Sequence, residues 1–178
     1  MRVNPVKPAR PVNSASLSIV RLAGFTGFTG LAYLARRMII NPEEEIQTYS
    51  DGGARGNPGP AATGSVLKQG DEVLWELGEY IGETTNNQAE YRALIKALEQ
   101  AKAMGAKKLH CFLDSELLVK QLKREYRVKE PTLQVLYLKA YNLAQQFSTV
   151  SFTHIRREYN KHADRLVNEA LDKQEEML

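Results

Sequence analysis

Four acidic residues stand where a cation would have to balance their charge. Asp51 opens the glycine-rich stretch DGGARGNPGP after the run EIQTYS, and Asp114 follows the run LHCFL. Glu90 and Asp164 each lie on the apolar face of a helical pattern, which would point them inward. A carboxylate at the end of a strand or on the core side of a helix is costly unless its charge is compensated. The four carboxylates therefore predict a site for metal ions.

The elements that must position these carboxylates follow from the spacing of apolar residues. Alternation predicts strands over 46–51, 62–69, 72–81, 107–113 and 149–155. Helical spacing predicts helices over 86–103, 115–123, 131–147 and 160–175. Thr85 followed by Gln88 predicts a capping box at the start of the first helix. The order predicts one α/β domain with a mixed sheet flanked by helices, in which strands one and four end at the same edge.

Charge and composition divide the chain near residue 40. Six of the 24 basic residues and none of the 21 acidic ones lie in residues 1–37, so the net charge of +3 hides a remainder with three excess acids. Early prolines and the run GFTGFTG predict a weakly ordered basic extension over 1–40, and a folded domain over 41–178. An organellar transit peptide and a true start at Met38 both fit the extension. Arg21 and the glycines argue against a membrane span, so we expect a cytoplasmic protein, or an organellar one if the extension is a transit peptide.

Cysteine and histidine usage excludes two other kinds of site. Cys111 is the only cysteine, which rules out an intrachain disulfide, and we expect it to be a small buried residue on a strand. The three histidines do not combine with it into any zinc-ligand spacing.

The basic residues of the folded part gather in two groups, which are either nucleic-acid contacts or solvated faces. These groups are Lys120, Lys123, Arg124, Arg127 and Lys129, and Arg156, Arg157, Lys161 and Arg165.

The acids belong to four blocks that resemble type 1 ribonuclease H in order and spacing, over roughly residues 46–172. The blocks are YSDGGARGNPGPAATG, TTNNQAEYRAL, FLDSELLVKQL and NKHADRLVNEAL. The resemblance implies a ribonuclease H-like fold with a five-stranded mixed sheet in the order 3-2-1-4-5. It also implies an endonuclease that hydrolyses the RNA strand of RNA–DNA hybrids with two Mg²⁺ ions, or Mn²⁺ in their place, leaving 5′-phosphate and 3′-hydroxyl ends. We expect a monomer with no membrane partner.

The same resemblance assigns roles to individual residues. Asp51 would bridge both ions, Glu90 and Asp114 would complete the site that activates water, and Asp164 would hold the ion near the leaving group. Other positions match substrate-contacting positions of the family, where amides recognise 2′-hydroxyls and base edges. They are Gly52, Gly53, Asn57, Asn86, Asn87, Gln88, Ser115 and Asn160. Asn86 and Asn87 equally suit helix capping, and the glycines equally suit a plain turn.

Three departures from the family pattern affect these expectations. The stretch KREYRVKEP is short and lacks the tryptophan of the basic protrusion that grips DNA in many bacterial members. The loop before Asp164 is compact; His154 falls in a strand, so Arg157 is the better candidate for an auxiliary catalytic role. Glu116 stands where well-known members have a glutamine. A non-catalytic binding module and a related nuclease acting on DNA are the alternatives, disfavoured by the four acids and by the asparagine-rich blocks respectively.

Overall fold

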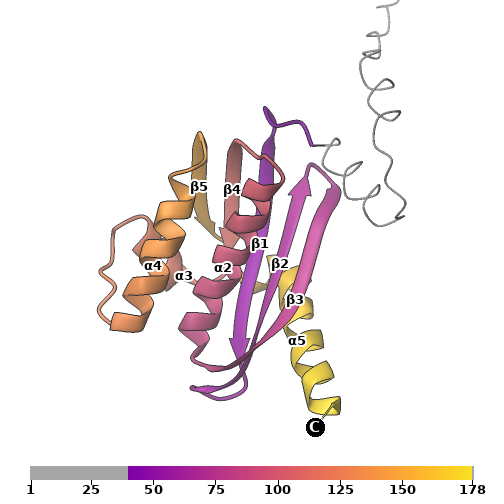
Figure 1. Cartoon of the computed structure of the whole chain (residues 1–178), viewed down its shortest axis with the longest axis vertical. Helices are drawn as coiled ribbons and strands as arrows, with labels where there is room; N and C mark the ends of the chain where they lie inside the picture. Colours follow the sequence, from indigo (N-terminus) through magenta and orange to yellow (C-terminus); the bar gives the residue numbers. More distant parts are fainter. Residues whose placement is uncertain (1–39, 178) are drawn as a thin grey trace, which may run out of the picture. The chain divides into compact units, whose positions relative to one another are not determined.

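A five-stranded mixed sheet forms the centre of the computed structural model, which describes residues 40–177 (Figure 1). The strands are β1 (Glu45–Ala54), β2 (Gly59–Gln69), β3 (Glu72–Thr84), β4 (Lys108–Leu113) and β5 (Thr149–His154). Their order is β3-β2-β1-β4-β5, with the β1–β2 and β2–β3 pairs antiparallel and the β1–β4 and β4–β5 pairs parallel. The predicted order and class are therefore confirmed.

Helices cover both faces of this sheet. They are α2 (Asn86–Ala103), α3 (Glu116–Leu122), α4 (Pro131–Ala144) and α5 (Lys161–Glu176), with a short 3-10 helix η3 (Arg157–Tyr159) before the last. Successive residues of β2 show the two layers, because neighbouring side chains point to opposite faces of a strand. The position next to α5 is Gly64, whereas the Ser65 hydroxyl donates to the Ala93 carbonyl of α2 at 2.9 Å. None of the described helices is long and apolar enough to cross a membrane.

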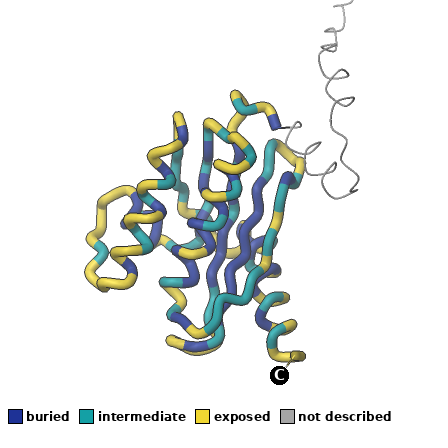
Figure 2. Tube along the Cα trace, in the orientation of Figure 1, coloured by how far each residue is buried: buried dark blue, intermediate teal, exposed yellow. Residues whose placement is uncertain are grey.

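The main core lies between the sheet and the α2–α4 layer. Its fully buried members include Ile46, Leu67, Leu94, Leu98 and Leu109, and α2 contributes the predicted apolar stripe. Figure 2 shows the central strands and the inner face of α2 as buried along most of their length. Ile40 is also buried in this core. The rest of the predicted extension lies outside the described residues.

A smaller core joins α5 to the other face. Ala62 of β2 packs there against Val167 and Leu171. The helix comes so close that a side chain at Gly64 would place its Cβ 2.1 Å from the Ala163 carbonyl oxygen. Only glycine fits there, which fixes the height of α5 above the sheet and with it the position of Asp164.

The first two predicted strands were too short at the glycine-rich turn. β1 continues to Ala54, which pairs with Ala61, and β2 begins at Gly59, which pairs with Thr84 of β3. The glycines and prolines of DGGARGNPGP made this stretch look like a loop, but paired backbone carries the strands through it. The capping box is only half formed. Thr85 accepts from the Gln88 backbone N–H, while the Gln88 side chain pairs with Thr84 instead of returning to the cap.

Candidate active site

Three of the predicted carboxylates meet at the junction of β1, β4 and α2. Parallel pairing of Ser50 with Leu113 brings the following residues, Asp51 and Asp114, side by side, and α2 adds Glu90 from above. One oxygen of each carboxylate lies within 4.8 Å of the others. Asp51 is 6% exposed and Glu90 7%, and Asp114 is half-buried. This arrangement concentrates negative charge where little water can solvate it.

Gly52 explains how α2 comes close enough to contribute Glu90. A Cβ at this position would lie 2.1 Å from the Ala89 carbonyl carbon and 2.2 Å from the Glu90 nitrogen. Gly53 is constrained from the other side, since its Cβ would lie 2.9 Å from a methyl carbon of Val167. We expected these glycines either to admit a nucleic-acid strand or to form a plain turn. In the structure they let two helices approach the backbone of β1.

Burial and mutual repulsion raise the pKa values of these carboxyls. Burial, followed by the charges of Asp114 and Asp164, raises the pKa of Asp51 to about 7. Burial and the neighbouring acids likewise raise the pKa of Glu90 well above its usual range. The pKa of Asp114 is raised chiefly by burial, and Asn160 partly offsets the rise. The guanidinium of Arg157 opposes the rise at all three carboxyls.

The oxygens of this cluster fit a hard cation. Among the described residues, Glu90 Oε2 and Asp114 Oδ1 are buried and have no hydrogen-bond donor. Buried acceptors are almost always satisfied, so such atoms call for a partner that is not a protein group. An all-oxygen set of carboxylates is the set that Mg²⁺ or Mn²⁺ prefers. The cluster is therefore suited to hold a metal ion.

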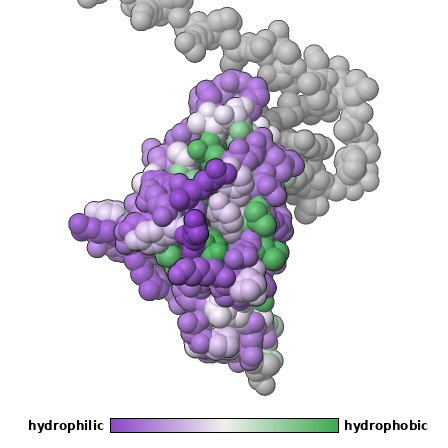
Figure 3. Space-filling model, turned by 90° about the vertical axis from the view of Figure 1, so that its left-hand side faces the viewer, coloured by the Kyte–Doolittle hydropathy of each residue, from purple (hydrophilic) through white to green (hydrophobic). Residues whose placement is uncertain are grey.

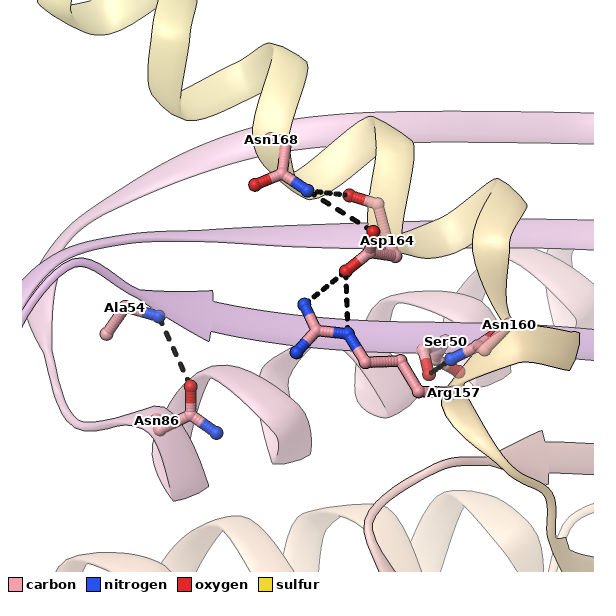
Figure 4. A network of polar contacts seen from close by, with 7 residues as sticks. All are labelled: Ser50, Ala54, Asn86, Arg157, Asn160, Asp164 and Asn168. Atoms are coloured by element: carbon pink, nitrogen blue, oxygen red, sulfur yellow. Dashed lines mark hydrogen bonds and ion pairs between the residues drawn. The ribbon is translucent and has the colours of Figure 1, made fainter.

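Asp164 shares the cavity but not the cluster. A cavity of about 390 Å³ is lined by all four predicted carboxylates together with Arg157. Asp164 is turned toward Arg157, whose Nε donates to its Oδ1 at 3.1 Å and whose Nη2 donates to the same oxygen (Figure 4). Its Oδ2 accepts from Asn168 Nδ2 at 3.3 Å. Asp164 thus enters the site already paired.

Asn160 lies beneath the site rather than on its surface. Its side chain is 1% exposed, and its Nδ2 donates to the Ser50 carbonyl at 2.9 Å (Figure 4). We expected a substrate contact at this position, but strands of nucleic acid cannot reach a side chain buried in this way. The amide instead joins the start of α5 to β1 directly before Asp51, which aligns the two elements that carry Asp51 and Asp164.

The other predicted contact residues surround the mouth of the site. Asn86 Oδ1 accepts from the Ala54 N–H at 3.3 Å, and Asn57 Oδ1 accepts from the Asn86 N–H at 3.2 Å. Asn57, Asn86 and Asn87 are exposed, so they remain available to a ligand. Gln88 is half-buried against Thr84. Ser115 caps α3 by accepting from the Leu118 N–H.

Two residues of the site were missed in the sequence. Asn168 donates to both the backbone and the carboxylate of Asp164, and its spacing of four residues on one helix could have indicated the contact. Arg55 also lines the cavity, and it pairs with Asp172 and Glu175 near the end of α5. No sequence signal pointed to Arg55, because its partners lie more than a hundred residues away.

The first basic group has partners of its own on the surface. Arg124 lies over the Tyr141 ring, 4.7 Å from its centroid, and Lys120 lies 5.0 Å from that of Tyr126. The view from the side of α3 and α4 shows a mostly hydrophilic surface with small separate hydrophobic patches (Figure 3). His154 lies in β5 as predicted, as the last residue of the strand, and it is exposed.

Comparison with known proteins places this geometry among related chains. Residues 49–170 match the model of the reverse transcriptase-like family. The chain is 44% identical over 137 residues to Ribonuclease HI from Halobacterium salinarum, covering 75% of this chain and 69% of that protein. It is 45% identical over 130 residues to the Bifunctional protein Rv2228c from Mycobacterium tuberculosis, covering 72% of this chain but only 36% of the relative. The chain thus spans about a third of the length of its mycobacterial relatives.

Solved structures agree with these relatives. The structure of RNase H1 from Halobacterium salinarum superposes with a TM-score of 0.71 at 45% identity, covering 72% of this chain and 98% of that chain. LC11-RNase H1, solved in complex with an RNA/DNA hybrid, gives a TM-score of 0.69 at 47% identity with the same coverage. At these identities the likeness extends beyond the fold alone.

Proposed function

Because the chain belongs to the reverse transcriptase-like family, and within it to the type 1 ribonucleases H, we propose that it is an endonuclease that hydrolyses the RNA strand of RNA–DNA hybrids. Products carry 5′-phosphate and 3′-hydroxyl ends. The observation that carries the proposal is the convergence of Asp51, Glu90 and Asp114 from three separate elements, with Asp164 in the same cavity. A binding module has no use for buried carboxylates that repel one another.

In this proposal the four carboxylates would hold two Mg²⁺ ions, with Mn²⁺ as a substitute. Asp51 would serve both ions, Glu90 and Asp114 would serve the first, and Asp164 would serve the second. Bound ions of this kind lower the pKa of a water nucleophile and stabilise the attacking and leaving oxygens of a phosphodiester. Asn160 positions the site by joining α5 to β1, since it is too buried to reach substrate. Arg157 assists turnover from the loop beside Asp164.

Substrate recognition falls to the exposed amides at the mouth of the cavity. Asn57 and Asn86 are linked to each other and to the backbone of β1, so they present polar groups from a fixed position. Asn87 projects from the same helix start, and Ser115 lies beside Asp114. Amides and hydroxyls of this kind bond the ribose 2′-hydroxyl, by which a site distinguishes RNA from DNA. Gln88 follows them on the same helix and completes the set, although its side-chain oxygen already accepts from the Thr84 hydroxyl in the free protein.

The catalytic unit in this proposal is the domain over residues 41–178, acting as a monomer. The enzyme works in the cytoplasm, or in an organelle if residues 1–37 act as a transit peptide. Those residues lie outside the described part of the chain.

A cleavage assay with three duplexes tests the proposal. Labelled RNA–DNA hybrid, double-stranded RNA and double-stranded DNA are incubated with the full chain, with Mg²⁺ or with a chelator. Cleavage of the hybrid alone, and only with Mg²⁺, is expected. Asp51→Asn should retain less than about a tenth of the activity, because the loss of one ligand to both ions removes more than 1.4 kcal/mol of transition-state stabilisation. Asp71→Asn, in the exposed β2–β3 turn, is the matched control. Binding without cleavage would favour the non-catalytic module, and cleavage of double-stranded DNA would favour the DNA nuclease.

A further inference from the structure

The four carboxylates of the cavity are not equivalent. Glu90 Oε2 and Asp114 Oδ1 are buried without a donor, whereas both oxygens of Asp164 are engaged. Arg157 donates to Oδ1 through two nitrogens, and Asn168 donates to Oδ2 (Figure 4). The part of the cavity around Glu90 and Asp114 can therefore accept a cation. The part around Asp164 is already occupied by a cationic side chain of the protein, the Arg157 guanidinium.

The Arg157 side chain is held by little else. It is 76% exposed, and Asp164 is its only ion-pair partner among the described residues. Its backbone is fixed separately in η3, where its carbonyl accepts from the Asn160 N–H at 2.9 Å. The guanidinium can therefore leave Asp164 by side-chain rotation, without any change in the fold. An exposed ion pair of this kind contributes at most about 1 kcal/mol to stability, so its loss costs little free energy.

A guanidinium that leaves a carboxylate needs another anion. Its planar set of donors matches phosphate oxygens as well as carboxylate oxygens. Arg156 precedes it, Lys161 begins α5, and both are exposed. Residues 155–161 carry a net positive charge even with Glu158 included. A phosphate brought to the cavity mouth is the partner that this chemistry favours.

We propose that Arg157 is an exchangeable counter-ion, which occupies Asp164 in the free protein and withholds it from the second metal ion. The inference rests on the proposed function, and it adds an order of events. The cluster of Asp51, Glu90 and Asp114 binds its ion first, without nucleic acid. Asp164 becomes a ligand when Arg157 moves to a substrate phosphate. The complete metal site then forms only in the presence of substrate.

Binding of Mn²⁺ in the absence of nucleic acid tests this order. Mn²⁺ is titrated into the full chain at constant ionic strength, and free Mn²⁺ is followed by electron paramagnetic resonance. The wild type should bind one Mn²⁺ ion more tightly and a second one much more weakly; these are the stronger and the weaker binding event. Arg157→Gln should strengthen the weaker event by about fivefold, the upper range for an exposed ion pair. Arg156→Gln is the matched control. It removes the same charge one residue away from Arg157, and the Arg156 side chain pairs with Glu158 instead of Asp164.

A double substitution separates local exchange from general charge effects. In the Asp164→Asn background, Arg157→Gln should no longer strengthen the weaker event, because the ligand that it released is gone. The inference is overturned, while the proposed function stands, in either of two cases. In the first, Arg157→Gln strengthens the weaker Mn²⁺ binding no more than Arg156→Gln does. In the second, Arg157→Gln strengthens it by the same factor whether residue 164 is Asp or Asn. If the wild type binds no Mn²⁺ at all, the metal site of the proposed function fails, and this inference fails with it.

Discussion

The charge of Asp51 should destabilise the metal-free protein, and Asp51→Asn should remove that destabilisation. The residue is 6% exposed, and its pKa is raised from 3.8 to about 7 by burial and by Asp114 and Asp164. A difference of about 3 pKa units between the folded and unfolded states corresponds to about 4 kcal/mol at most. Part of this is shared with the coupled carboxyls, so Asp51→Asn should raise the free energy of unfolding by about 2–4 kcal/mol above pH 7.

The stabilising effect of Asp51→Asn should depend on pH. Because the folded pKa lies above the unfolded one, the native state binds more protons between about pH 4 and pH 7. The contribution of Asp51 to the stability of the metal-free wild type therefore falls as pH rises through that window and levels off above it. Asn at position 51 does not titrate. The advantage of Asp51→Asn should be near zero at pH 4 and largest at pH 8, where it raises the thermal midpoint by about 6–12 °C.

Thermal and urea unfolding in a chelator, from pH 4 to pH 9 at constant ionic strength, measure this difference. Asp71→Asn, in the exposed turn, should show no such pH profile. Mg²⁺ should then raise the midpoint of the wild type progressively, since it binds the folded state, and should raise that of Asp51→Asn much less. An advantage independent of pH, or equal responses to Mg²⁺, would refute the idea that these carboxylates converge on one charged site.

Three further perturbations test the framework around the site. A chain shortened to residues 38–178 should melt and cleave like the full chain; a loss above about 1.4 kcal/mol, a tenfold change in the folding equilibrium, would show that the removed residues pack on the domain. Gly52→Ala should lower the free energy of unfolding by about 3 kcal/mol or more, because its methyl group meets the α2 backbone, and an unchanged urea midpoint would contradict that contact. Asn160→Ala should cost about 1–3 kcal/mol by urea unfolding, since it removes the bond to Ser50, and a loss under 0.5 kcal/mol would assign the residue no part in joining α5 to β1.

The elements of the fold were predictable where local signals were strong. The 86–103 helix was placed with both ends correct, because Thr85 marks its start and a continuous apolar stripe marks its face. β4 and β5 were placed to within a residue by their short alternating runs. The ends of β1 and β2 were not, because their pairing with each other and with β3 runs through glycines and a proline that alone indicate a loop. Tertiary pairing there overrode local preference.

The sequence predicted which acids form the site, but not which of them are already paired with other side chains. Four blocks in order were enough to select Asp51, Glu90, Asp114 and Asp164. Sequence could not show that Asp164 is already paired, because Arg157 and Asp164 meet only through the compact turn between η3 and α5. Burial was equally hidden at Asn160, whose block matched a contact position although its side chain points into the protein. Contacts between distant segments, such as Arg55 with α5, leave no periodic trace.

The close approach of helices to β1 links these observations into one physical account. Two glycines of that strand carry no side chain, so α2 and α5 come near enough to direct carboxylates toward the same cavity. The packing of the two cores holds the acids together against their repulsion, and it does so before any ion binds. A site assembled in this way is destabilised when empty and stabilised when filled, which couples metal binding to stability without a change of fold. Arg157 moderates that repulsion in the free protein, because it is the one guanidinium among the described residues that pairs with a carboxylate of this cavity's acidic set.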